Sequence, residues 1–275
     1  MSHSQISLGL GLGGGKFATD SGRPRGSSDP PGGENQLTYP GGIWSSSGAT
    51  YFIDTAPTMH FDASIIDGAD PNNNPSNGAA VSTWADRSGN GTDYDASQSN
   101  ASEQPVYTAS GPGSQPTITW SGDKLDLATT WSQSGSITGV FISQATNDHK
   151  TSPTGYTGFA NQLYNEAFPS TTADFFGGQQ ATNVSNKQGF NYITARRDGS
   201  SAALFEQGGS SILTATRSAT IYIDRLGDAS GSGRYNHLGT ISEIMVFDSA
   251  LSTSELNTIR LYIANKYSIS TSAFS

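Results

Sequence analysis

Two glutamates on expected strands are the first residues in this 275-residue chain that could do chemistry. Glu206 lies in AALFE and Glu243 lies in TISEI. A glycosidase built on a β-sandwich needs two carboxylates that flank the bond to be cleaved. The sequence holds no close set such as E-x-D-x-E. Each glutamate is therefore expected to be a solvated or rim carboxylate, and the sequence predicts no enzymatic activity.

The histidines and cysteines do not provide nucleophilic catalysis either. No G-x-S-x-G elbow is present to expose a serine nucleophile, and a lone histidine is more often structural than catalytic. Because the chain contains no cysteine, disulfides, thiolate zinc sites and cysteine nucleophiles are excluded. The four histidines are His3, His60, His149 and His237.

Two acidic loops carry the hard oxygen ligands that Ca²⁺ prefers. The first loop contains Asp67 and Asp70, and the second contains Asp86 and Asn90. Neither loop has the spacing of an EF-hand. The alternative is that these side chains form Asx turns with their own backbone. Ca²⁺ is the one cofactor that the sequence suggests, and this alternative stays open beside it.

Aromatic side chains in or near expected loops are the candidates for binding sugars. An aromatic ring offers an apolar face, while neighbouring polar side chains bond the sugar hydroxyls. The alternative is that these rings close the open ends of a sandwich core. The five candidates are Trp44, Trp131, Tyr156, Tyr164 and Tyr235.

The elements that must position these residues are mostly strands. Short apolar or alternating runs recur between turn formers, for example at 136–144 and 190–195, which is typical of an antiparallel sandwich. A helix is expected only near the C-terminus, where Ser252 and Glu255 can form a capping box and apolar residues follow at helical spacing over 256–267. The sequence predicts an all-β, two-sheet antiparallel sandwich with one C-terminal helix.

Residues 1–50 differ from the rest of the chain. Runs such as ISLGLGLGGG and DSGRPRGSSDPPGG contain too much Gly and Pro for a helix or a regular strand. One interpretation is a disordered linker. The interpretation we favour is an extended arm that adds a strand to the sheet edge of a neighbouring molecule, with residues 51–275 as the folded domain. The apolar residues of that strand would be Ile6, Leu8, Leu10 and Leu12.

The charge balance limits the partners. With 14 Lys and Arg against 23 Asp and Glu, the formal net charge is −9. Nucleic acids and anionic membrane surfaces both need clustered basic side chains, so neither is an expected partner. The sequence has no apolar run long enough to span a bilayer and no secretion leader. A location outside the cell would therefore need another route, such as release within a virus particle.

Four blocks of the sequence resemble concanavalin A-like, laminin-G-type jelly-roll domains of bacterial and phage proteins. They are MHFDAS from Met59, VSTWADRSGNG from Val81, QPTITW from Gln115 and GTISEIMVFDSALSTSEL…YIANKY from Gly239. The blocks occur in the family's order. The resemblance implies a concanavalin A-like jelly roll with Trp84 and Trp120 in its core, and it favours Ca²⁺ near the rim.

These observations lead to one main functional hypothesis and one alternative. The main hypothesis is a non-enzymatic virion structural protein, such as a capsid decoration, head fibre or tail component on the particle surface. Its N-terminal arm would dock to other virion proteins or to copies of itself, and its jelly roll would also bind host glycans. The alternative is a carbohydrate-binding module or adhesin for cell-surface polysaccharide. A polysaccharide-degrading enzyme ranks last, for lack of a carboxylate pair.

Overall fold

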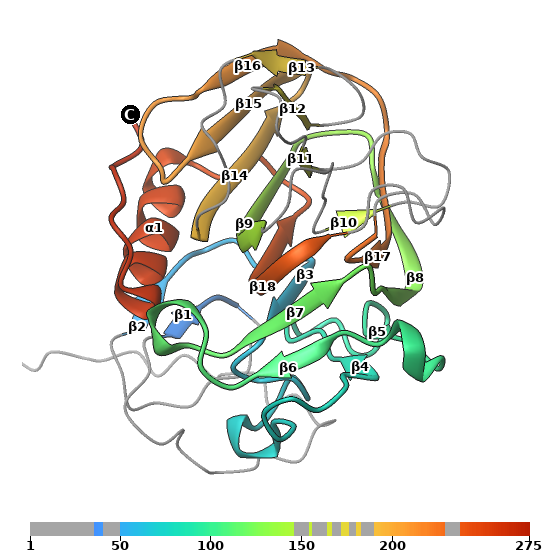
Figure 1. Ribbon diagram of the computed structural model, residues 1–275. Coiled ribbons are helices and arrows are strands. Elements are labelled where there is room, and N and C mark those ends of the chain that lie inside the picture. The colour runs from blue at the N-terminus through green and yellow to red at the C-terminus, as the bar shows by residue number, and fades with distance from the viewer. Residues whose placement is uncertain are drawn as a thin grey trace, which may run out of the picture.

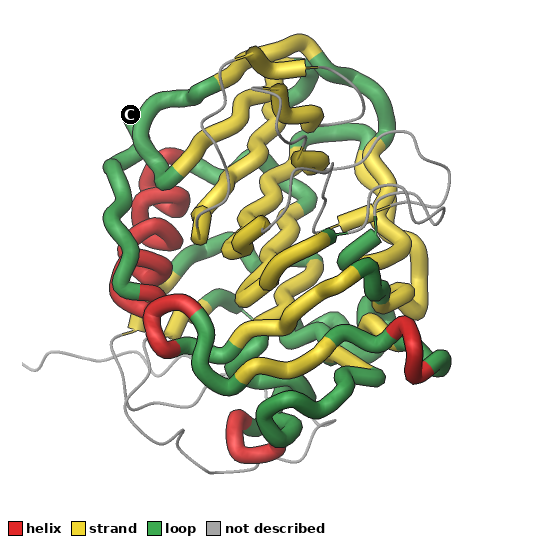
Figure 2. The backbone as a smooth tube through the Cα atoms, viewed as in Figure 1, coloured by secondary structure: helices red, strands yellow, loops and turns green. Residues whose placement is uncertain are grey.

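Two large antiparallel sheets and one C-terminal helix make up the fold, which is shown as a computed structural model in Figure 1. The structure describes residues 36–40, 50–145, 154–155, 164–166, 172–175, 180–182, 190–228 and 237–275. Strands dominate these residues, and the long helix lies along one side of the molecule (Figure 2). The predicted all-β sandwich with a single terminal α-helix is confirmed for the described part of the chain.

The larger sheet has the strand order β16-β15-β14-β9-β18-β7-β6, and β3 also pairs with β18. Its strands are β3 (Met59–Asp62), β6 (Val106–Thr108), β7 (Thr117–Ser121), β9 (Ile137–Ala145), β14 (Phe190–Asp198), β15 (Ser201–Glu206), β16 (Leu213–Thr216) and β18 (Leu238–Phe247). Strand β18 is the centre of this sheet, because it pairs with β9 along one edge and with β7 and β3 along the other.

The smaller sheet has the order β10-β17-β8-β5-β4. Its strands are β4 (Thr83–Trp84), β5 (Ala96–Ser97), β8 (Leu125–Gln133), β10 (Thr154–Gly155) and β17 (Ile221–Leu226). The pairing of β17 with β8 is irregular, since Ile223 faces Trp131 but Arg225 faces Asp126. Four residues of β8 therefore oppose one residue of β17, which is an enlarged β-bulge.

Short elements complete the described chain. They are the parallel pair β1 (Gln36–Thr38) and β2 (Thr50–Phe52), the ladder of β11 (Tyr164–Glu166), β12 (Thr172–Phe175) and β13 (Gln180–Thr182), and the 3₁₀ turns η1 (Pro71–Asn73), η2 (Ala101–Glu103) and η3 (Pro112–Ser114). Leu37 and Tyr39 are buried against the domain. The proposed arm residues Ile6, Leu8, Leu10 and Leu12 lie outside the described residues.

The main core fills the space between the two large sheets. Alternate residues of β8 point inward, so Leu125, Leu127 and Trp131 are buried while Ala128 and Ser132 are exposed. Trp84 and Trp120 join the same core, as the resemblance implied. Large aromatic rings supply much of the apolar area that such a core removes from water.

Helix α1 (Thr253–Tyr267) covers the outer face of the larger sheet. Ser252 and Glu255 form the predicted capping box, which satisfies backbone N–H groups at the start of the helix. The helix packs on residues that alternate with the main core, including Val140 on β9 and Met245 on β18. Strands buried on both faces explain the continuous apolar runs in their sequences. No helix among the described residues is long and apolar enough to cross a bilayer.

His237, just before β18, should make the stability of the fold depend on pH. Its side chain is buried, and burial lowers the pKa of the imidazole from 6.5 to about 4. The unfolded chain therefore binds this proton more tightly than the folded one, so stability falls as the pH drops from the unfolded toward the folded pKa. By about pH 4.5, this one residue should lower the free energy of unfolding by about 2–3 kcal/mol.

Urea titrations of the wild type and of His237→Gln at about pH 7 and about pH 4.5 measure this effect. Carboxylates titrate in both proteins, so their contribution cancels in the comparison. The variant should lose less stability on acidification than the wild type does. Equal losses in the two proteins would show that His237 is not the group responsible.

Candidate functional site

Of the five predicted sugar-binding aromatics, the structure describes the side chain of Trp131 alone. Trp131 lies on β8 with 4% of its surface exposed and packs in the main core, so its assignment as a surface platform is wrong. The polar residues around it suggested a loop, but strand alternation turns its ring inward. The backbone of Tyr164 belongs to β11. Trp44, Tyr156 and Tyr235 lie outside the described residues.

The predicted Ca²⁺ ligands make hydrogen bonds to the backbone of the chain. Asp67 Oδ1 accepts from the backbone N–H groups of residues 69 and 70, and Asp70 caps η1. Asp86 is buried and accepts from the backbone N–H groups of residues 60 and 88, while Asn90 donates to the carbonyl oxygen of residue 58. Several of these are the Asx-type contacts of the alternative interpretation. The Ca²⁺ site stays a prediction.

A buried group of charged side chains joins three of the four resembling blocks. We call it the ionic cluster, and its members are His60, Asp62, Arg87, Glu243 and Lys266, none more than 6% exposed. The expectation that Glu243 is a solvated or rim carboxylate is therefore wrong. Antiparallel pairing of β3 with β18 places Asp62 opposite Glu243. Lys266 comes from α1, which covers the outer face of this sheet.

Lys266 and Arg87 neutralise the two carboxylates of the ionic cluster. The Lys266 ammonium lies 2.8 Å from Oδ2 of Asp62 and 3.0 Å from Oε2 of Glu243. Arg87 Nη1 donates to the same oxygen of Asp62, and His60 Nε2 lies 2.7 Å from Oε1 of Glu243. Paired in this way, the buried charges avoid the large cost of an isolated ion.

Three tyrosine hydroxyls complete the hydrogen bonding around the ionic cluster. Tyr262 and Tyr267 both donate to the Glu243 carboxylate, at 2.9 and 2.8 Å. Tyr39 bonds Nδ1 of His60 at 2.7 Å. Burial strongly raises the pKa of both helix tyrosines, and the charge of Glu243 raises it further. They therefore stay protonated and act as donors.

The charges of the ionic cluster hold one another ionised. Burial favours the neutral form of Asp62, but Lys266 and Arg87 outweigh it and hold the pKa of this carboxyl well below its usual range. Burial also opposes ionisation of Glu243, and Lys266 again reverses the effect and lowers the pKa. The pKa of Lys266 is raised, because its two carboxylates outweigh the effect of burial. Neither carboxylate has a raised pKa of the kind that a general acid near neutral pH needs.

Three members of the ionic cluster also have the arrangement of metal ligands. Ligand atoms of His60, Asp62 and Glu243 all lie within 4.8 Å of one another. However, the Lys266 ammonium already bridges the two carboxylates, and both ring nitrogens of His60 have partners within the chain. The chain supplies its own cation here, so we assign the ionic cluster a structural role.

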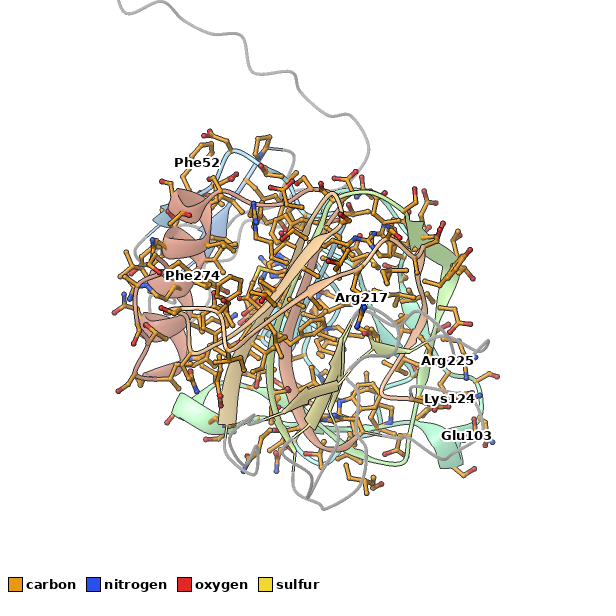
Figure 3. The ribbon with its side chains drawn as sticks, turned by 90° about the horizontal axis from the view of Figure 1, so that it is seen from above. Phe52, Glu103, Lys124, Arg217, Arg225 and Phe274 are labelled. Atoms are coloured by element: carbon orange, nitrogen blue, oxygen red, sulfur yellow. The ribbon has the colours of Figure 1, made fainter. Side chains whose placement is uncertain are left out.

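A second group of charged side chains, which includes exposed carboxylates, lies on the opposite side of the molecule. Strands β8, β10 and β17 lie across the molecule from α1 in Figure 1, and Figure 3 shows Glu103, Lys124 and Arg225 together on that side. We call this surface the Arg225 face. Its charged and aromatic members are Glu103, Lys124, Asp126, Tyr222, Asp224, Arg225 and Asp228.

Arg225 is the centre of this face. Its Nε lies 2.9 Å from Asp224, its Nη1 lies 3.4 Å from Asp228, and its Nη2 lies 3.5 Å from Asp126. Burial opposes the charge of Arg225, but these carboxylates outweigh it and raise the pKa of the guanidinium. The Lys124 ammonium lies 3.8 Å from Asp126. The side chain of Asp126 is 46% exposed, so a dissolved molecule can reach it.

Tyr222 adds an aromatic ring to the same sheet face. Ile221 and Ile223 are buried in the core, so Tyr222 and Asp224 point to the outside of the smaller sheet, where both are half-buried. Tyr222 pairs across the strands with the exposed Ser132. Tyr222 was not among the residues predicted to bind sugar, although the alternation in IYIDRL contains the signal. An aromatic ring beside fixed polar groups is the combination that sugar recognition uses.

Sequence comparison identifies no relatives, and structure comparison identifies the fold. No protein-family model and no curated protein matches the chain. Among solved structures, the chain is similar to Trypanosoma rangeli sialidase in complex with 2,3-difluoro-KDN, with a TM-score of 0.50 and 11% identity over 78% of the chain. The chain spans only 34% of the length of that sialidase.

Two smaller structures are similar over more of their own length. Domain 4 of AbnA, a GH43 extracellular arabinanase from Geobacillus stearothermophilus in complex with arabinotriose, has a TM-score of 0.47 at 12% identity, covering 76% of this chain and 99% of that domain. The CBM40 of Ruminococcus gnavus IT-sialidase, bound to α2,3 sialyllactose, has a TM-score of 0.36 at 18% identity, covering 45% and 81%. Of these three likenesses, only that to the Trypanosoma rangeli sialidase reaches a TM-score of 0.50, and at 11% identity it indicates a shared fold alone.

The main functional hypothesis from the sequence is corrected by this comparison. The solved structure that reaches a TM-score of 0.50 is a sialidase, which is a glycosidase and not a virion protein. The hypothesis of a non-enzymatic virion structural protein is therefore wrong on both points, the virion role and the exclusion of enzymatic activity.

Proposed function

We propose that this chain is a carbohydrate-binding module whose Arg225 face holds the glycan. The observation that carries the proposal is the contrast between the two outer sheet faces. Helix α1 covers the outer face of the larger sheet. Among the described residues, no helix covers the outer face of the smaller sheet. This face presents Tyr222 beside paired charges.

The chemistry of the Arg225 face suits sugar hydroxyls. A hydroxyl both donates and accepts, so it can donate to Asp126 and accept from Lys124. Hydrogen bonds to charged groups are stronger than bonds between neutral ones. The ion pairs among Arg225, Asp126 and Lys124 also hold these side chains in place before a ligand arrives, which lowers the entropy lost on binding.

The similar folds support the same proposal. The sialidase structure holds a sugar derivative, the AbnA domain holds arabinotriose, and the CBM40 holds sialyllactose. Apart from Glu103, which comes from η2, the residues of the Arg225 face come from strands β8 and β17 and their ends, so the sandwich itself fixes their positions. A site built on sheet strands is more rigid than one built on loops.

Replacing Asp126 by asparagine should weaken glycan binding by about tenfold or more, because a hydrogen bond to a charged acceptor contributes about 1.5–3 kcal/mol. The matched control is Asp198→Asn. Asp198 is also an exposed carboxylate paired with an arginine, at 3.2 Å, but it lies at the end of β14 in the larger sheet. Calorimetric titration with a panel of soluble oligosaccharides measures both variants.

The wild type and Asp198→Asn should bind the same oligosaccharide with similar affinity, and Asp126→Asn should bind it more weakly. The release of reducing sugar from each oligosaccharide is followed in the same samples, so that any turnover is detected. Equal affinity of the two variants would show that the glycan binds elsewhere on the molecule and not at the Arg225 face. Failure of the wild type to bind any member of the panel at millimolar concentration would overturn the proposed function.

A further inference from the structure

From the charges of the Arg225 face, we infer that its ligand is a neutral, hydroxyl-rich glycan and not one that carries carboxylates. This inference rests on the proposed function and narrows its ligand class. Among the described residues of the face, four carboxylates, those of Glu103, Asp126, Asp224 and Asp228, stand against two cations, Lys124 and Arg225. The arithmetic gives a local charge of −2, in a chain whose formal net charge is −9.

The guanidinium of Arg225 is already engaged by the protein. Recognition of a sugar carboxylate typically uses two parallel N–H groups of an arginine. Here all three guanidinium nitrogens lie within 3.5 Å of aspartate oxygens, Nε at Asp224, Nη1 at Asp228 and Nη2 at Asp126. A sialic acid or uronic acid would have to displace one aspartate and would still lie beside the other two. Like charges at such distances repel.

Lys124 does not provide an alternative anion site. Its ammonium lies 3.6 Å from Glu103 and 3.8 Å from Asp126, and the side chains of both acids are more than 40% exposed. An approaching carboxylate therefore meets two exposed negative charges beside Lys124, and the exposed Asp126 lies beside Arg225 as well. A hydroxyl group meets no such repulsion, because it can donate to Asp126 or Glu103. The same carboxylates that exclude an acidic sugar thus hold a neutral one.

Matched pairs of oligosaccharides test this inference. Lactose and 3′-sialyllactose differ by one sialic acid, and galactotriose and trigalacturonate differ by three carboxylates. Calorimetric titrations of the full chain with both pairs and with arabinotriose, at low and at high salt, give the order of affinities. Within a pair, the neutral member should bind at least about tenfold more tightly at low salt, and the difference should shrink at high salt because salt screens the repulsion.

A charge variant makes the test specific to the Arg225 face. Glu103→Gln removes one exposed carboxylate, so it should raise the affinity for the acidic member of a pair relative to the neutral one. Asp198→Asn, which removes an exposed carboxylate from the larger sheet, should leave the ratio unchanged. Tighter binding of the acidic member, or equal binding of the two, would overturn the inference and leave carbohydrate binding standing. If no sugar binds, both the inference and the proposed function fail.

Discussion

Replacing Lys266 by methionine should lower the free energy of unfolding by about 3–5 kcal/mol, the cost of removing one partner from a buried ion pair. Methionine has a similar length and keeps the apolar contacts of the lysine stem, so the change removes mainly the charge and its hydrogen bonds. Asp62 and Glu243, each no more than 1% exposed, would lose the cation that lies between them. Urea denaturation at neutral pH measures the loss.

The matched control is the same substitution at an exposed lysine. Lys124 pairs with Glu103 and Asp126 at 3.6 and 3.8 Å, and its side chain is 28% exposed. Pairs of this kind contribute about 0–1 kcal/mol, so Lys124→Met should change stability little. Losses of similar size in Lys124→Met and Lys266→Met would contradict the structural role assigned to the ionic cluster.

Acidification should distinguish lost charge from lost packing in Lys266→Met. In the wild type the pKa of Asp62 and of Glu243 is lowered, so the stability that these carboxylates contribute is present above their ordinary pKa range and is lost as the pH falls below it. Without Lys266 the buried carboxylates repel each other, which favours protonation of one of them. Acidification therefore removes part of the repulsion that destabilises the variant. The stability difference between the two proteins should therefore shrink as the pH falls. A difference that stays constant with pH would mean that packing, not charge, is responsible.

The ionic cluster illustrates what the sequence could and could not predict. Strand, turn and helix signals identified β18 and α1, because periodicity and capping depend on residues close together in the chain. The contacts of the ionic cluster join residues 60, 87, 243 and 266, which are far apart in the chain. The spacing of apolar residues along the sequence does not predict contacts of this kind. One local signal was present, since Lys266 lies on the apolar stripe of the helix beside Tyr262 and Ile263. A lysine on a buried stripe implies a buried partner, because charged residues are rarely buried unpaired.

The Arg225 face was missed for a different reason. The sugar-binding aromatics were expected in or near loops, but the aromatic ring of this face, Tyr222, lies on a strand. The alternation in IYIDRL was enough to put Tyr222 outside the core, and the alternation of β8 was enough to put Trp131 inside it. What could not be predicted is that Arg225 and Asp126 come together, because the irregular register between β17 and β8 decides it. Bulges of this kind redirect side chains in ways that sequence spacing does not reveal.

Gly113→Ala should strongly lower the stability of the fold, because the added methyl group would collide with the end of α1. Gly113, in η3, has φ +64, and a Cβ at this position would lie 2.2 Å from the carbonyl oxygen of Tyr267 and 2.5 Å from its carbonyl carbon. Tyr267 ends α1, so its backbone cannot move away without shifting the helix end. The left-handed backbone costs about 1–2 kcal/mol for a non-glycine residue, and overpacking adds about 1–3 kcal/mol.

Gly199→Ala separates these two costs. Gly199 has nearly the same backbone conformation, with φ +58, and a Cβ there would meet nothing within 4 Å. It should therefore lose only the backbone contribution, and the difference between the two variants, about 1–3 kcal/mol by urea denaturation, measures the collision with Tyr267. Equal losses would show that η3 can move away from the helix end.

The collision and the ionic cluster should be coupled through the same tyrosine. The hydroxyl of Tyr267 donates to Glu243 at 2.8 Å, so displacing the end of α1 disturbs the hydrogen bonds that Lys266 shares. Residues that act through one network give non-additive changes, with interaction energies of about 0.5–3 kcal/mol. The double variant Gly113→Ala, Lys266→Met should therefore be more stable than the sum of the two single losses predicts, while Gly199→Ala, Lys266→Met should be additive. Additivity in both pairs would mean that α1 and the ionic cluster are independent, and that the charges do not fix the position of the helix.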